Sequence, residues 1–93
     1  MKKVISQSKL DAEAWYYLGV AYVQLKDFKN AGGAFETAIN IRPEFAEAHT
    51  GFSYVLMRRG KLSEARKESE KALEIEPKNP EAHYTLGLIS FIT

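Results

Sequence analysis

The strongest constraint on the fold is a repeat with a period of 34 residues that begins at Ala12. A shift by this period aligns Ala12 with Ala46, Ala31 with Ala65, Ala38 with Ala72, Ile41 with Ile75 and Pro43 with Pro77. A second shift brings Glu13, Tyr16 and Gly19 onto Glu81, Tyr84 and Gly87. A fixed period of this size indicates a solenoid, in which one supersecondary unit stacks on copies of itself.

The period divides the chain into four parts. Residues 12–45 form a first unit, residues 46–79 a second, and residues 80–93 the first helix of an incomplete third unit. Residues 1–11 are expected to be an N-terminal cap or the remnant of a preceding repeat, with Val4, Ile5 and Leu10 placed to face a core. Asp11 is placed to cap the helix that follows.

Each unit is predicted to be a helical hairpin. In the first helix of unit one, Trp15, Leu18, Gly19 and Tyr22 recur at helical spacing, which predicts one buried stripe. After a turn at Lys26-Asp27, the second helix is expected to bury Phe28, Ala31, Phe35, Ala38 and Ile39 or Ile41. It should end at Arg42, because the residue before a proline is disfavoured in the helical region.

The later helices are expected at residues 46–59, 62–75 and 80–92. Gly60 suits the left-handed position at a helix C-terminus, and Asn79-Pro80 is a strong helix start. Gly32-Gly33 interrupts the second helix of unit one, and each glycine costs about 1 kcal/mol relative to alanine there. The pair is either a weak spot on an outer face or the site of a close backbone approach.

Composition narrows the function classes. A chain of 93 residues allows one domain, and 13 basic against 12 acidic residues give no net field for nucleic acid or an anionic membrane. The absence of cysteine excludes disulfides and thiolate chemistry. Polar residues interrupt any apolar run near the N-terminus, and no segment has the roughly 20 apolar residues of a membrane span. A cytoplasmic location is therefore expected.

Eight residues of the first unit carry a family resemblance. Signature positions are held by Trp15, Leu18, Gly19, Tyr22, Ala31, Phe35, Ala38 and Pro43, and at this spacing they resemble the tetratricopeptide repeat pattern. The second unit departs from it with His49, Phe52-Ser53, Leu56 and Ser69, and the third with His83. The resemblance implies an all-α solenoid of helical hairpins, a right-handed superhelix whose first helices line a concave groove. It further implies a protein-interaction module without chemistry of its own.

A second stripe on each first helix is the candidate binding surface. The stripes read Glu13, Tyr16, Val20, Val23 and Gln24, then Glu47, Thr50, Tyr54, Met57 and Arg58, then Glu81, Tyr84, Leu88 and Phe91. Tyrosine and methionine give much contact area at low entropic cost, as a binding surface requires. The alternative is that Val20, Val23 and Leu88 mainly pack against neighbouring first helices.

The same stripes predict the charge of the partner. Some tetratricopeptide domains grip acidic C-terminal tails of heat-shock chaperones through Lys, Asn and Arg side chains. Here the corresponding floor holds Tyr16, Val20, Tyr54 and Glu81, and the three glutamates along one rim would repel a carboxylate. An apolar or basic peptide is therefore the expected ligand.

The sequence offers no catalytic or metal constellation. His49 and His83 stand one repeat apart, whereas a metal site needs three or four ligands around one ion, so both are interpreted as structural. Neither histidine has a clear nucleophile or orienting carboxylate beside it, and Gly32-Gly33 lacks the lysine of a phosphate loop. We expect no enzyme activity, no metal and no cofactor.

The last helix suggests a second kind of function. Leu88, Ile89, Phe91 and Ile92 make it apolar on more than one side, whereas the outer face of a terminal helix should be polar. Either the chain is a piece of a longer array, or this edge is covered by another copy. Self-association through these four residues is thus the alternative function.

Overall fold

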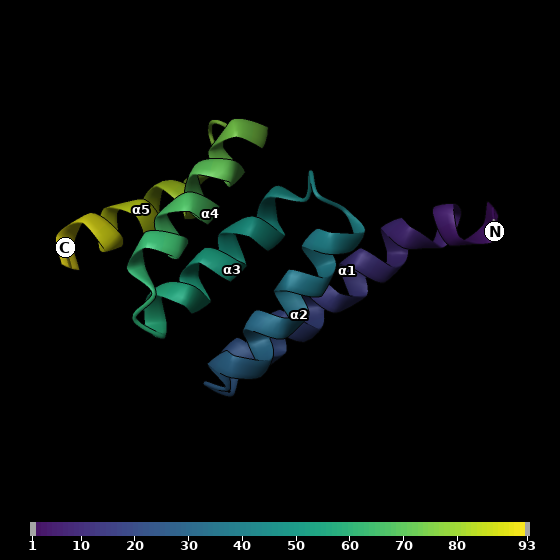
Figure 1. Cartoon of the computed structure of the whole chain (residues 1–93), viewed down its shortest axis with the longest axis horizontal. Coiled ribbons are helices and arrows are strands. Elements are labelled where there is room, and N and C mark those ends of the chain that lie inside the picture. The colour runs from purple at the N-terminus through teal and green to yellow at the C-terminus, as the bar shows by residue number, and fades with distance from the viewer. Residues whose placement is uncertain (1, 93) are drawn as a thin grey trace.

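The computed structural model describes the backbone of residues 2–92 and the side chains of residues 10–92. In that range the chain forms five α-helices and no strand: α1 (Lys2–Gln24), α2 (Phe28–Ile41), α3 (Ala46–Arg58), α4 (Leu62–Ile75) and α5 (Pro80–Ile92). The helices follow one another along an elongated body of 45 × 29 × 18 Å (Figure 1). None of these helices combines the length and the apolar character that a membrane crossing requires.

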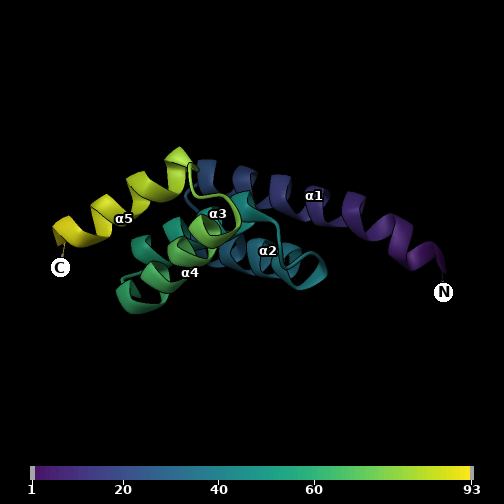
Figure 2. The same cartoon turned by 90° about the horizontal axis from the view of Figure 1, so that it is seen from above.

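The helices pack as consecutive hairpins. α1 packs against α2 and α3 against α4, while α2 contacts α3 and α4 contacts α5 to join one hairpin to the next. Seen from above, α1 and α5 lie on one side of the molecule and α2 and α4 on the other, with α3 between them (Figure 2). The predicted all-α solenoid of helical hairpins is confirmed.

The two tight turns use the same backbone device one period apart. Lys26 has φ 62° and Gly60 has φ 83°, so both adopt the left-handed conformation that ends a helix. The next amide then bonds back to the helix: Asp27 N–H donates to the Tyr22 carbonyl at 2.9 Å, and Lys61 N–H to the Leu56 carbonyl at 2.8 Å. The predicted turns are confirmed, but at Lys26 a residue with a side chain occupies the strained position.

The start of α5 also follows its sequence signal. Asn79 is 2% exposed, and its Oδ1 accepts the Ala82 N–H at 2.9 Å, while its Nδ2 donates to Glu76 Oε1 at 2.9 Å. Asn79 thus caps α5 as predicted, and its side chain also bonds to the residue that follows α4. Pro80, which has no N–H to satisfy, begins the helix.

The expected helix start at Asp11 is wrong. α1 runs without a break from Lys2 to Gln24, because this stretch contains no proline and its only glycine, Gly19, lies in the packed part of the helix. Leu10, expected to face a core, is 66% exposed. The same expectation for Val4 and Ile5 falls outside the side chains that the structure describes.

Phe35 occupies the centre of the first hairpin. Its side chain is 2% exposed and packs in a cluster with Ala31 and Val55, so it contributes to the contact between α2 and α3 as well as to that between α2 and α1. Gly19 on α1 lies directly beside the ring, because a Cβ there would come within 2.7 Å of it. The large ring thus requires a glycine opposite it.

In the second hairpin a hydrogen bond replaces this ring. Ser69, one period after Phe35, is fully buried, as is Ser53, one period after Gly19. The two hydroxyls form a hydrogen bond with an O–O distance of 2.5 Å. Ser53 Oγ donates its proton to the Ala65 carbonyl at 2.6 Å, so Ser69 is the donor between the two serines. Because both groups are satisfied, their burial carries no unpaired polar atom.

Half of the predicted core stripe on α1 is exposed. Gly19 is buried and Tyr22 is half-buried, but Trp15 and Leu18 are each 40% exposed. One period later, Phe52 is half-buried because α2 packs on that face of α3, and His49 is buried against the α2–α3 turn and Glu68 of α4. In the described part of the chain no helix covers the corresponding face of α1, which explains the exposure of Trp15 and Leu18.

The two adjacent glycines of α2 play different parts: one marks a close helix approach and the other lies on an outer face. Gly32 is buried, and a Cβ there would lie 3.4 Å from Val55 Cγ1, so this glycine marks a close approach of α2 to α3. Gly33 is exposed, and nothing lies within 4 Å of a Cβ placed there. Only Gly33 is therefore a weak spot on an outer face.

Candidate peptide-binding groove

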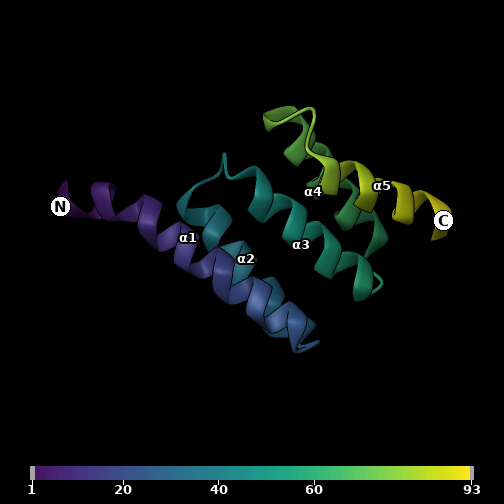
Figure 3. The ribbon, with the colours of Figure 1, turned by 180° about the vertical axis from the view of Figure 1, so that it is seen from behind.

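Two hollows open on the side of the molecule formed by the first helices. α1, α3 and α5 run side by side there, in front of α2 and α4 in Figure 3. The first hollow, which we call the central groove, has a volume of about 320 Å³. It is lined by Tyr16, Val20, Val23, Phe35, Glu47, Thr50, Gly51, Tyr54, Glu81, Tyr84 and Thr85. Its lining is mostly apolar, and its charged residues are glutamates.

Most residues of the predicted stripes line this groove, but six do not. The groove brings together Tyr16, Val20, Val23, Glu47, Thr50, Tyr54, Glu81 and Tyr84 from three helices. Glu13 lines the neighbouring hollow, and Gln24, Arg58, Leu88, Phe91 and Met57 line neither. Sequence reasoning missed Phe35, Gly51 and Thr85, because Phe35 belongs to a second helix and the other two lie off the predicted stripe.

Met57 is the clearest error among the proposed binding residues. It is only 7% exposed and packs with Leu56, Ala65 and Ile89 between α3, α4 and α5. Met57 lies at the border between the predicted core stripe and the predicted binding stripe of α3. Its spacing was therefore compatible with either stripe. Once α5 packs on α3, that border is interior, so Met57 is part of the core.

Arg58 closes the end of α3 rather than lining the groove. Its Nη1 donates to the Tyr54 hydroxyl at 2.9 Å, and its guanidinium lies 4.7 Å from the centre of the Phe28 ring. The Tyr54 and Phe28 rings meet edge to face with centroids 6.4 Å apart. These contacts orient the Tyr54 ring that lines the groove.

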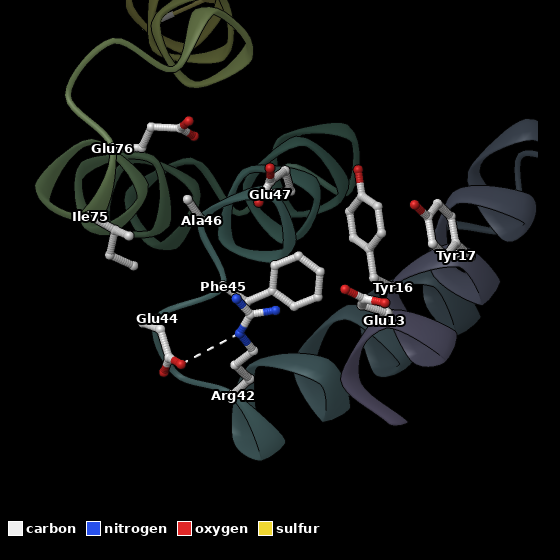
Figure 4. A pocket seen from close by; sticks show the side chains of 10 residues that line it. All are labelled: Glu13, Tyr16, Tyr17, Arg42, Glu44, Phe45, Ala46, Glu47, Ile75 and Glu76. Atoms are coloured by element: carbon white, nitrogen blue, oxygen red, sulfur yellow. Dashed lines mark ion pairs between the residues drawn. The ribbon is translucent and has the colours of Figure 1, made fainter. Parts of the chain in front are cut away.

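The second hollow, which we call the turn pocket, lies where α2 turns into α3. It has a volume of about 710 Å³ and is lined by Glu13, Tyr16, Tyr17, Arg42, Glu44, Phe45, Ala46, Glu47, Ile75 and Glu76 (Figure 4). The Phe45 ring lies between the Arg42 guanidinium and the Tyr16 ring. Except for Glu13, Tyr16 and Glu47, sequence reasoning missed these residues.

Tyr16 links the two hollows, because it lines both. Its ring packs with those of Tyr17, Phe35 and Phe45, at centroid distances of 5.2, 5.7 and 5.2 Å. Burial raises the pKa of the Tyr16 hydroxyl, and the carboxylates of Glu47 and Glu81 raise it further. The neutral hydroxyl therefore stands in a field set by two glutamates of the groove.

His49 links the α2–α3 turn to α4. Its Nδ1 lies 2.7 Å from Glu68 Oε1 on α4, and its Nε2 lies 2.7 Å from the Pro43 carbonyl in the α2–α3 turn. Both partners are hydrogen-bond acceptors, so this arrangement favours the doubly protonated ring, which donates from both nitrogens. Burial by itself lowers the pKa of His49, but the bonds to Glu68 and Pro43 outweigh it and the pKa rises above 6.5.

Its partner Glu68 shifts in the opposite direction. Burial by itself raises the pKa of the Glu68 carboxyl, but the hydrogen bond from His49 and the neighbouring Lys71 ammonium outweigh it and hold the pKa below 4.5. His83, one period after His49, repeats the contact to the turn, with Nε2 2.8 Å from the Pro77 carbonyl. The described residues contain no group of three or more His, Asp or Glu side chains that could hold a metal ion.

The proposed self-association edge is only partly at the surface. Phe91 is 89% exposed and Ile92 is 56% exposed, whereas Leu88 is half-buried. Ile89 is fully buried against Leu56 and Ala65, so its assignment to this edge is wrong. The sequence could not separate the two sides of α5, because the helix is apolar nearly all round.

The fold is that of a helical-repeat scaffold. A family profile described as "Tetratricopeptide repeat" matches residues 12–45, and one described as "TPR repeat" matches residues 54–91. The chain belongs to the tetratricopeptide repeat (TPR) family. Domains of this family typically act as interaction modules without catalysis. A search among curated proteins returned no match.

Solved structures agree with the family assignment. The first TPR domain of Spaghetti (RPAP3), bound to the HSP90 peptide SRMEEVD, is 30% identical over 87% of this chain with a TM-score of 0.83. The second TPR domain of human RPAP3, in complex with the HSP70 peptide SGPTIEEVD, is 25% identical over 86% of the chain, also with a TM-score of 0.83. MamA is 28% identical over 87% of the chain, with a TM-score of 0.82. This chain spans 64%, 67% and 47% of those three chains.

Proposed function

We propose that this chain is a non-catalytic scaffold that binds an apolar or basic peptide segment in its central groove. The observation that carries the proposal is the groove itself, where aromatic and aliphatic side chains of four helices surround about 320 Å³. Tyr84 is 66% exposed on one wall, so it is available for contact at little cost to the fold. Aromatic side chains in such hollows typically dominate binding energy.

The charge of the groove supports an apolar or basic ligand over an acidic one. The peptides in the two RPAP3 structures both end in EEVD, which is strongly acidic. Here Glu47 and Glu81 line the groove, and no lysine or arginine is among its lining residues. Because like charges in a binding site oppose association, an acidic tail should bind poorly.

The test is fluorescence anisotropy with labelled peptides of equal length in acidic, neutral and basic sets. We expect the neutral and basic sets to bind and Tyr84→Ala to weaken them by at least about fivefold. Phe91→Ala is the matched control, since it removes another exposed aromatic ring from α5 that lines neither hollow. A clear preference for acidic peptides, or equal effects of the two substitutions, would refute the proposal.

Self-association through α5 remains the second candidate function, favoured by the exposure of Phe91 and Ile92. An apolar ring that is 89% exposed gains from burial against a second copy. Light scattering over a wide range of concentrations should then show assembly that Phe91→Glu abolishes. A monomer at every concentration would rule this candidate out.

A further inference from the structure

The turn pocket and the central groove form one continuous surface with two chemically different parts. They share Tyr16 and Glu47, which stand at the boundary between them. The groove is the more apolar part, whereas the turn pocket adds Glu13, Glu44 and Glu76 and is the larger of the two hollows. A ligand that fills the groove therefore reaches a polar, acidic hollow at one end.

The turn pocket already holds one cation of the protein against an aromatic ring. The Arg42 guanidinium lies 5.0 Å from the centre of the Phe45 ring and pairs with Glu44 at 3.4 Å (Figure 4). This contact shows that ring and carboxylate together can accommodate a guanidinium here. Because Arg42 and Glu44 neutralise each other, the net charge of the pocket is set by the other charged residues that line it.

Those remaining residues give the pocket a negative charge. Glu13, Glu47 and Glu76 also line it, and none of the three takes part in an ion pair within the described side chains. The raised pKa of Tyr16, caused by burial and then by Glu47 and Glu81, is consistent with a negative potential at the boundary. Ile75, 41% exposed, adds an apolar wall along which the stem of a long side chain can lie.

We propose that the turn pocket receives the ammonium or guanidinium group of a basic side chain from the same peptide whose apolar side chain fills the central groove. This proposal rests on the proposed function and adds a second, charged anchor to it. The ring of Tyr16 would contact the cation, and Glu13 and Glu47 would balance its charge. The ligand is thus an apolar residue followed closely by lysine or arginine.

The test uses three acetylated and amidated tetrapeptides, Leu-Trp-Lys-Leu and its analogues with norleucine or glutamate in place of lysine. Norleucine keeps the hydrocarbon stem of lysine and removes its ammonium group. We expect the lysine peptide to bind about three- to tenfold more tightly than the norleucine peptide, from a cation–π contact and a partly screened ion pair. High salt should reduce this advantage, and the glutamate peptide should bind most weakly.

Substitutions locate the effect. Combining Glu13→Gln with Glu47→Gln should bring the lysine peptide to the affinity of the norleucine peptide. Glu74→Gln is the matched control, since it removes an exposed carboxylate of α4 that lines neither hollow. Arg42→Gln removes the internal cation and should strengthen binding of the lysine peptide. Circular dichroism checks that each variant is folded.

The outcomes distinguish the charged anchor in the turn pocket from peptide binding in the central groove. If the lysine and norleucine peptides bind equally, or if Glu74→Gln matches the double variant, the charged anchor is refuted while the groove stands. If Tyr84→Ala leaves the norleucine peptide unaffected, the groove itself is refuted. Failure of all three peptides to bind would overturn both proposals.

Discussion

The Phe35 ring lies against the backbone of Gly51 so closely that a Cβ at Gly51 would stand 2.7 Å from it. Gly19 closes on the same ring from α1 at the same distance, so the ring is enclosed by two glycines of different helices. A ring flanked this closely leaves no room for a methyl group on either glycine. The contact therefore joins the first hairpin to the second through one side chain.

Gly51→Ala should destabilise the protein. Alanine gains about 1 kcal/mol from helix propensity, but overpacking against an enclosed ring typically costs 1–3 kcal/mol, about the same or more. We expect a net loss of roughly 1 kcal/mol, measured by urea denaturation. The loss should shrink in a Phe35→Leu background, because the smaller side chain leaves room for the new methyl group.

Gly87→Ala and Gly33→Ala are the matched controls. Nothing lies within 4 Å of a Cβ at either position, and both are exposed in helices. Only the helix-propensity gain of about 0.5–1 kcal/mol should remain. A loss of stability at Gly87 equal to that at Gly51 would contradict the steric explanation.

Lys26→Gly should stabilise the first hairpin by about 1 kcal/mol. Lys26 has φ 62°, where a Cβ is unfavourable and glycine is not. The reciprocal change, Gly60→Ala, places the same strain in the second hairpin and should cost a similar amount. The midpoint of urea denaturation measures both, and shifts in the same direction would argue against this explanation.

Stability should peak between about pH 4.5 and pH 6.5, where the buried His49–Glu68 pair is fully charged in the folded state. His49 has a raised pKa, so its contribution is present below 6.5 and is lost as the pH rises through the folded value. Glu68 has a lowered pKa, so its contribution is present above 4.5 and is lost as the pH falls. Lys71, which pairs with Glu68 at 3.3 Å, opposes the protonation of His49 but does not reverse the sign.

Thermal denaturation across this range checks the prediction. His49→Gln should flatten the decline in Tm on the alkaline side, because the titrating ring is gone. His83→Gln is the control, since that ring is exposed and its Nε2 contacts the Pro77 carbonyl rather than a carboxylate. An unchanged alkaline decline in His49→Gln would show that another group causes it.

Ile89→Ala and Phe91→Ala should separate the two sides of α5. Ile89 is fully buried against α3 and α4, so its truncation should cost about 2–5 kcal/mol. Phe91 is 89% exposed, so its truncation should change stability by less than about 0.5 kcal/mol. Chemical denaturation of both variants tests whether α5 is docked as described, and equal effects would contradict it.

The sequence predicted the helix boundaries after Gln24 well because they depend on local signals, whereas the start of α1 was predicted wrongly. Proline after Arg42 and the Asn79-Pro80 pair act within a few residues, and the period carries each signal to the next unit. Burial was predicted less well, since it depends on what packs outside the unit. Trp15 fits the core pattern, yet its exposure depends on whether another helix covers α1.

The candidate site shows the same division. Tyr16, Tyr54 and Tyr84 followed from helical spacing, because three parallel first helices bring equal register positions together. The turn pocket did not, since Phe45 and Ile75 come from segment ends that no period relates to the groove. The Arg42-Pro43-Glu44-Phe45 turn carried one usable signal, an arginine beside an aromatic residue and a carboxylate.

Exchange of repeat units between proteins would meet an obstacle in this chain. The boundary between the first and second units lies between residues 45 and 46. Two contacts cross it: Phe35 packs against Gly51, and His49 contacts the Pro43 carbonyl. A second unit taken from another protein, with a larger residue at the position of Gly51, would clash with the Phe35 ring of the first unit. The smallest portable module is therefore not one period of sequence but a segment that carries both sides of the joint.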